Sequence, residues 1–129
     1  MMDSCGTVFL TEITVMTVKV SPIKALIQAI DFASQSHRVT GQNLANINTP
    51  GYQSREVQFD QLLNRLDGGE PADAEYQVTK AKGLAERADG NNVDLDREMG
   101  SLRKNALAHQ TLTQLLGSKM SILQQAIRG

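Results

Sequence analysis

The chain has 129 residues, of which 40% are hydrophobic, 4% aromatic and 21% charged, and its formal net charge at pH 7 is -1. This length fits one modest domain, and the scarcity of aromatic residues requires an aliphatic core, which favours helices packed on helices. The balanced charge argues against a surface that binds nucleic acid or an anionic membrane, and the single cysteine, Cys5, excludes an internal disulfide and a zinc–thiolate cluster.

Residues 1–21 are expected to form a flexible N-terminal extension. Residues 7–20 are rich in Thr and Val with partial alternation, which is typical of an extended or unstructured chain. The segment does not resemble a secretory signal, because its only early charge is Asp3 and its apolar part is interrupted, and no run in the chain is long enough to span a membrane. Met16 is an alternative start, since the organised pattern begins only after Ser21, a suitable N-cap, and Pro22.

Residues 22–47 are predicted to form a long helix. Its apolar and neutral residues recur in alternating steps of four and three, which places them on one stripe, here called the seam. Asn46 and Asn48 can adopt the left-handed conformation of a helix end, and Pro50 forbids continuation. The seam of this helix consists of Leu26, Ile30, Ala33, His37, Thr40, Leu44 and Ile47.

Residues 48–59 are predicted to form a sharp corner followed by an irregular extended piece. Thr49-Pro50-Gly51-Tyr52 fits a type II turn, because Pro presets the first central position and Gly supplies the positive φ of the second. The corner is either an ordinary helix exit or a surface contact, and its spacing alone does not decide between them.

The remaining chain is predicted to contain a short helix, a loop and a second long helix. The short helix covers 60–67, with Asp60 as N-cap and Gly68-Gly69 as its stop, and 68–93 form a variable, partly mobile loop with a short strand around 76–79. The second long helix covers 94–128, with Asp94 as N-cap. Its seam keeps four-three spacing through Leu95, Met99, Leu102, Ala106, His109, Thr113, Leu116, Met120, Leu123 and Ile127.

Formal charge is missing from parts of both long helices. Residues 39–54 and 105–118 contain no Lys, Arg, Asp or Glu, and their polar positions hold Gln, Asn, Ser and Thr. Such residues form hydrogen bonds without the desolvation cost of an ion, so both helices could be enclosed on more than one side. Two interpretations follow: a helical hairpin in a small monomer, or two paired helices that also pack against copies or relatives. The second is favoured, since two helices alone cannot cover both sides.

No motif for chemistry stands out. His37 and His109 fall on seam positions without a Cys or carboxylate nearby, so we expect core histidines that set helix register rather than metal ligands. Residues 89–99 superficially resemble a calcium loop, but Val93 and Leu95 stand where oxygen ligands are needed. No nucleophile elbow or phosphate-binding loop is present, so an enzyme, a cofactor and a small-molecule substrate are not expected.

Two stretches together resemble a known family. "NLANINTPGYQ", residues 43–53, and "DGNNVDLDREM", residues 89–99, are similar to segments of the rod proteins of the bacterial flagellar basal body. The short length is closest to the proximal, B-type members rather than to the longer distal rod or hook proteins. The motif residues shared with the family are Asn43, Asn46, Thr49, Pro50, Gly51 and Tyr52.

The resemblance implies a mainly α fold in which the N- and C-terminal helices pack as an antiparallel coiled coil. It covers about 23–66 and 89–127 and does not extend to 1–15. It further implies export without a cleaved signal, a place in the periplasmic rod that transmits torque, and contacts with copies, other rod proteins, the membrane-ring adaptor and the export gate. The alternative function is a helical adaptor or export cofactor that does not polymerise.

Overall fold

The computed structural model describes residues 22–68 and 75–129, in the order α2(Pro22–Ala45), β1(Arg55–Val57), α3(Phe59–Leu66), β2(Val78–Lys80) and α4(Leu95–Arg128). The predicted N-terminal extension 1–21, with the alternative start at Met16, lies outside these residues, as do residues 69–74 of the predicted variable loop. The fold is mainly helical. No helix in the described ranges has both the length and the apolar character needed to cross a bilayer.

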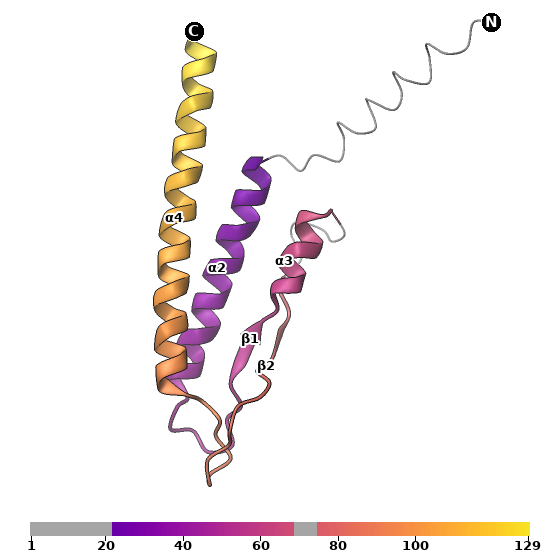
Figure 1. The fold of residues 1–129 in the computed structure, drawn as a ribbon, viewed down its shortest axis with the longest axis vertical. Helices are drawn as coiled ribbons and strands as arrows, with labels where there is room; N and C mark the ends of the chain where they lie inside the picture. Colours follow the sequence, from indigo (N-terminus) through magenta and orange to yellow (C-terminus); the bar gives the residue numbers. More distant parts are fainter. Residues whose placement is uncertain (1–21, 69–74) are drawn as a thin grey trace, which may run out of the picture.

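The two long helices form one antiparallel pair. α4 and α2 lie side by side and run in opposite directions, and α3 and β1 also pack against α2 (Figure 1). Glu56 of β1 reaches Arg97 near the start of α4 as well. α4 has 34 residues and α2 has 24, so α4 is longer by about 15 Å at about 1.5 Å per residue. The C-terminal part of α4 therefore extends past the start of α2 in the described structure (Figure 1).

Local sequence explains most helix boundaries. Pro22 occupies the first turn of α2, where its missing N–H is not needed. The Asp94 side chain accepts hydrogen bonds from the N–H groups of Asp96 (3.0 Å) and Arg97 (3.1 Å), which confirms it as the N-cap of α4. The N-cap predicted at Asp60 is wrong: α3 begins at Phe59, so Asp60 lies inside the first turn, where its charge still favours the helix dipole.

The two strands form one antiparallel pair. Arg55 lies opposite Lys80, Glu56 opposite Thr79 and Val57 opposite Val78. The N–H of Ala81 donates to the carbonyl of Ser54 (2.8 Å) and extends the pairing by one step. Residues 75–93 of the predicted variable loop are thus partly tied to the sheet; the mobility predicted for this loop stays a prediction.

Among the described residues, the buried hydrophobic side chains are mainly aliphatic, as predicted, namely Ala33, Val39, Leu62 and Val93; the aromatic rings gather beside them at one place, where only Tyr76 is buried. The ring of Phe32 on α2 meets Phe59 and Tyr76 edge to face, at centroid distances of 5.9 and 5.5 Å. The guanidinium carbon of Arg65 lies 3.7 Å from the Tyr76 ring centroid, a cation–π contact, and the Tyr76 hydroxyl donates to the Gln28 carbonyl (3.2 Å). Composition alone did not reveal that the few aromatic residues would meet at one place.

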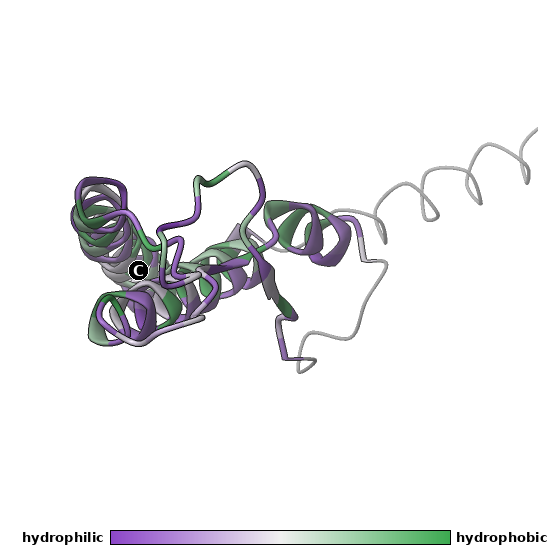
Figure 2. Cartoon of the chain, turned by 90° about the horizontal axis from the view of Figure 1, so that it is seen from below, coloured by the Kyte–Doolittle hydropathy of each residue, from purple (hydrophilic) through white to green (hydrophobic). Residues whose placement is uncertain are grey.

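The described structure leaves many apolar side chains uncovered. Seen along the long axis, apolar segments lie on outward-facing turns of the helices as well as between them (Figure 2). The most exposed include Ile127 at 85%, Leu107 at 65% and Ile122 at 58%, all on α4. In contrast, only Glu98 of α4 is buried. A single copy therefore covers little of its longest helix.

Candidate assembly site

The two stretches that the sequence singles out, residues 43–53 and 89–99, meet at one end of the molecule. The N–H of Gly51 donates to the carbonyl of Asp89 (2.9 Å), and the N–H of Asn92 donates to the carbonyl of Tyr52 (3.3 Å). A Cβ on Gly90 would lie 3.4 Å from the Gly51 Cα, so the backbones touch at two glycines. We call this contact region, which ties 43–55 to 87–98, the joint.

The corner itself is a type II turn. The N–H of Tyr52 donates to the carbonyl of Thr49 (3.3 Å), and Gly51 has φ +71°. The turn predicted from the sequence is confirmed. The left-handed helix end predicted for Asn46 and Asn48 is wrong, since no non-glycine residue in the described ranges has a positive φ.

The end of α2 is held by an asparagine from the other stretch. Asn91 is fully buried, and its side-chain amide donates to the carbonyls of Asn46 (3.0 Å), Ile47 (3.1 Å) and Thr49 (2.9 Å). Its side-chain oxygen accepts from the N–H of Val93 (2.8 Å). These carbonyls belong to the turn that follows α2, and Asn91 gives each of them an additional donor from a distant segment. Asn91 thus ties this turn to the chain that leads into α4.

Arg87 reinforces this arrangement. One guanidinium nitrogen donates to the carbonyl of Ile47 (3.2 Å) and the other to the carbonyl of Val93 (2.9 Å). A cation at a helix C-terminus also interacts favourably with the helix dipole. Arg87 thus binds the end of α2 and the chain leading into α4 at the same time.

Asn43 holds the corner against β1. Its Nδ2 donates to the carbonyl of Arg55 (2.8 Å) and its Oδ1 accepts from the Arg55 N–H (3.0 Å), so the side chain pairs with β1 as a strand would. The same oxygen accepts from the Tyr52 hydroxyl (3.2 Å), and Nδ2 also donates to Ser54 Oγ (3.1 Å). Asn43 is 1% exposed, so this amide is satisfied entirely within the protein.

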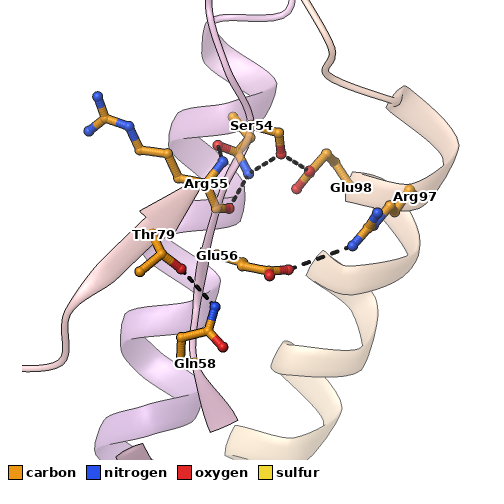
Figure 3. A network of polar contacts seen from close by, with 8 residues as sticks. Ser54, Arg55, Glu56, Gln58, Thr79, Arg97 and Glu98 are labelled. Carbon is orange, nitrogen blue, oxygen red and sulfur yellow. Dashed lines mark hydrogen bonds and ion pairs between the residues drawn. The ribbon is translucent and has the colours of Figure 1, made fainter. Parts of the chain in front are cut away.

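Ser54 connects the corner to α4. Its hydroxyl donates to Glu98 Oε1 (2.8 Å) and its N–H donates to Asn92 Oδ1 (2.6 Å). Figure 3 shows the first of these bonds and, further along, the ion pair between Arg97 and Glu56, with an N···O distance of 3.7 Å. Asn92 also donates to the Gln53 side chain (2.9 Å). Elements distant in sequence are thus joined through short, mostly uncharged side chains.

The motif residues predicted from the sequence all lie in or beside the joint, but they contribute differently. Asn43 and Tyr52 take part in the hydrogen-bond network described above. The Asn46 side chain donates to the carbonyl of Gln42 (2.8 Å) and accepts from the Thr49 hydroxyl (3.2 Å), while Pro50 and Gly51 are exposed. The sequence did not identify Ser54, Arg87, Asn91, Asn92 or Glu98 as part of the site.

The seam residues lie in several environments. On α2, Leu26, Ile30 and Leu44 are half-buried. On α4, Leu102 and Leu116 are half-buried, whereas four others are exposed: Leu95 at 51%, Met99 at 36%, Met120 at 46% and Leu123 at 45%. Exposure of apolar seam residues in a single copy is what the assembly interpretation requires.

The joint has the composition of a structural connection rather than a reaction centre. Its buried polar groups are amides, a serine hydroxyl and one carboxylate, and Ser54 donates to that carboxylate instead of to a histidine. Within residues 22–68 and 75–129, no group of three or more His, Cys, Asp or Glu side chains is placed to bind a metal. The arrangement fixes the angle at which the chain leaves α2 and enters α4.

Comparison with known proteins decides the family. No family model matches the chain. A flagellar basal body rod protein FlgB from Cereibacter sphaeroides is 30% identical over 115 residues, covering 79% of this chain and 90% of that protein. The chain belongs to the FlgB family of flagellar basal body rod proteins. The resemblance read from residues 43–53 and 89–99 is thereby confirmed.

Two further FlgB relatives come from distant bacteria. The Bacillus subtilis protein is 28% identical over 120 residues, covering 83% of this chain and 93% of its own length. The Salmonella typhimurium protein is 28% identical over 127 residues, covering 79% and 89%. The FlgB relatives thus match this chain over nearly their whole length.

Proposed function

We propose that this chain is a structural subunit of the flagellar basal body rod, and that its exposed helical surfaces pack against neighbouring subunits. Membership of the FlgB family supports the first part. The observation that carries the second is the exposure of Leu95, Met99, Met120 and Leu123 on α4. Apolar side chains that form a regular stripe and lack cover in one copy are typical of a surface buried on assembly.

Charge distribution supports the same proposal. Residues 105–118 of α4 contain no Lys, Arg, Asp or Glu, so a partner could pack there without desolvating an ion. Leu107 and Leu115 lie in this stretch and are 65% and 45% exposed. An isolated solvated helix would normally place charges at such positions.

The finer parts of the proposal rest on the family resemblance. The subunit occupies the proximal rod in the periplasm, leaves the cytoplasm through the flagellar export apparatus without a cleaved signal, and transmits torque as part of the rod. Its neighbours are copies of itself, other rod proteins, the membrane-ring adaptor and the export gate. α2 and α4 pack as an antiparallel coiled coil in the assembled rod, and the corner at Thr49–Tyr52 contacts a neighbouring subunit.

The assembly proposal is tested by placing charge on the seam. We expect Leu116→Asp combined with Leu123→Asp to abolish rods in purified basal bodies and to abolish swimming, because two buried carboxylates without partners are costly. Ser121→Asp combined with Gln125→Asp is the matched control, since both positions are exposed, polar and outside residues 105–118, and the added charge is equal. Normal rods in the seam variant would overturn the proposal.

The alternative, a helical adaptor or export cofactor that does not polymerise, predicts a different distribution. A rod subunit is retained in purified basal bodies after the cytoplasmic membrane is removed, whereas an adaptor is lost with the cytoplasmic fraction. Detecting the tagged wild-type chain in isolated rods therefore separates the two functions. Its absence from rods that are otherwise intact would favour the adaptor.

A further inference from the structure

His37 on α2 and His109 on α4 lie on the same small crevice between the two helices. The crevice has a volume of about 300 Å³ and is lined by Ser34, His37, Ala106 and His109. Both histidines are exposed, so the expectation that they are core residues that set helix register is wrong. The structure instead brings the only two histidines of the chain to one open site.

The opposite directions of α2 and α4 favour convergence of the two imidazoles. Ser36 and Thr40 of α2 line a neighbouring cleft together with Ser101 and Asn105 of α4, so these parts of the helices are level. His109 is one turn beyond Asn105, further from the joint than His37. Side chains lean toward the N-terminus of their own helix, and α2 and α4 run in opposite directions (Figure 1). We therefore infer that His37 and His109, which line the same crevice, lean toward each other.

The residues around the pair leave room for a ligand. Ser34 and Ala106 precede the two histidines by one turn each and carry small side chains. Within the described ranges, no protein group forms a hydrogen bond or ion pair with either imidazole. Both rings are thus free to offer a nitrogen to the crevice.

We propose that His37 and His109 together bind a divalent transition-metal ion of borderline softness, such as Zn²⁺, which bridges α2 and α4. Imidazole nitrogen is a favoured ligand of Zn²⁺, Ni²⁺ and Cu²⁺, and nitrogen lies about 2.0–2.1 Å from zinc in such sites. Two protein ligands leave the other coordination positions to water, so the bound ion is exchangeable. The bridge fixes one helix against the other within a single chain and does not depend on assembly into a rod.

Direct binding measurements test the pair. In a Cys5→Ser background without an affinity tag, we expect the full chain to bind Zn²⁺ at least about tenfold more tightly than His37→Ala or His109→Ala, because the second ligand acts at high effective concentration. With Cu²⁺ as a probe, electron paramagnetic resonance should show two imidazole nitrogens in the parent chain and one in each single variant. Equal zinc affinity in the parent and either variant would overturn the proposal.

A control keeps the number of histidines constant. His109→Ala combined with Lys119→His leaves two histidines but moves one along α4 by ten residues, about 15 Å at about 1.5 Å per residue. We expect this variant to bind zinc as weakly as His109→Ala alone. Zinc in excess should also raise the midpoint of thermal unfolding of the parent chain by roughly 10 °C at about 100-fold saturation, and not that of the control. Parent-like zinc affinity in the control would also overturn the proposal.

Discussion

The joint and the far end of α4 differ in how they satisfy their own side chains. In the joint, Asn43 is 1% exposed and Asn91 fully buried, and hydrogen bonds from the same chain satisfy both amides. Beyond Leu116 every residue of α4 is exposed, including Met120, Leu123 and Ile127. The joint satisfies its buried amides within a single copy, whereas the far end of α4 leaves its apolar side chains exposed. Mutations should therefore affect folding at the first region and assembly at the second.

The largest effect on folding is expected at Asn91. Replacing it with alanine removes one donor from three carbonyls in the turn after α2 and the acceptor of the Val93 N–H. Each carbonyl keeps a second donor, from the Thr49 N–H, Arg87 or the Tyr52 N–H, so only the Val93 N–H loses its partner, and we expect Asn91→Ala to lower the free energy of unfolding by about 1–3 kcal/mol. Urea denaturation followed by circular dichroism measures this change.

Asn48→Ala is the matched control for Asn91→Ala. Asn48 is exposed, and no side-chain hydrogen bond of Asn48 is found within the described ranges. We expect a change within about ±0.5 kcal/mol. If both asparagine variants unfolded at the same urea concentration, the joint would not be the self-sufficient region.

Two glycines should respond in opposite directions. Gly90 has φ +81°, and a Cβ there would meet the Gly51 Cα at 3.4 Å, so Gly90→Ala should destabilise by roughly 1–2 kcal/mol. Gly117 lies within α4 with nothing within 4 Å of an added Cβ, so Gly117→Ala should stabilise by about 1 kcal/mol or less. Thermal unfolding of the two variants gives the sign of each change. A stabilising Gly90→Ala would show that the backbone contact is not tight.

The ion pair between Glu56 and Arg97 should contribute little. Its N···O distance is 3.7 Å and the two side chains are 40% and 45% exposed, so solvent screens the attraction. A double-mutant cycle with Glu56→Gln and Arg97→Gln should give a coupling free energy of about 0–1 kcal/mol. A coupling free energy above that range would show that this ion pair also holds β1 against α4.

The smallest effect on folding is expected at the far end of α4. Ile127 is 85% exposed, so Ile127→Ser should change the free energy of unfolding by no more than about 0.5 kcal/mol. The same substitution should reduce rod assembly in basal bodies, in proportion to the apolar surface lost from the proposed interface. Destabilisation of the isolated chain comparable with that of Asn91→Ala would contradict the contrast between the regions.

Local patterns in the sequence predicted what depends on neighbouring residues. Pro50 and Gly51 define a type II turn by their own backbone preferences, and Asp94 caps α4 through groups two and three residues away. Asn91 escaped prediction because its partners are 42 to 45 residues distant, and no local rule connects them. The only signal was a pair of asparagines directly after a glycine.

Helical spacing predicted that α4 carries an apolar stripe, but it did not predict which way that stripe faces in the folded chain. The seam of α4 is regular, yet Leu95 and Met99 are exposed whereas the neighbouring Glu98 is buried and bonded to Ser54. The hydrogen bonds of the joint fix the rotation of α4 at its first turn, and the apolar stripe follows from that. A pattern of residues cannot report this rotation, since it is set by a contact between distant segments.

The pairing of β1 with β2 beside the joint also determines where additional sequence can be inserted into the chain. The chain leaves it along β1 and returns along β2, with Val57 directly opposite Val78, so the segment between these strands begins and ends at one place. Doubling the length of such a closed excursion costs only about 0.6 kcal/mol in loop entropy. New sequence inserted between Gly68 and Glu75 would therefore leave α2, α4 and their connection in place. This gives evolution, or a protein engineer, a position at which a second module can be added to the same two-helix stem.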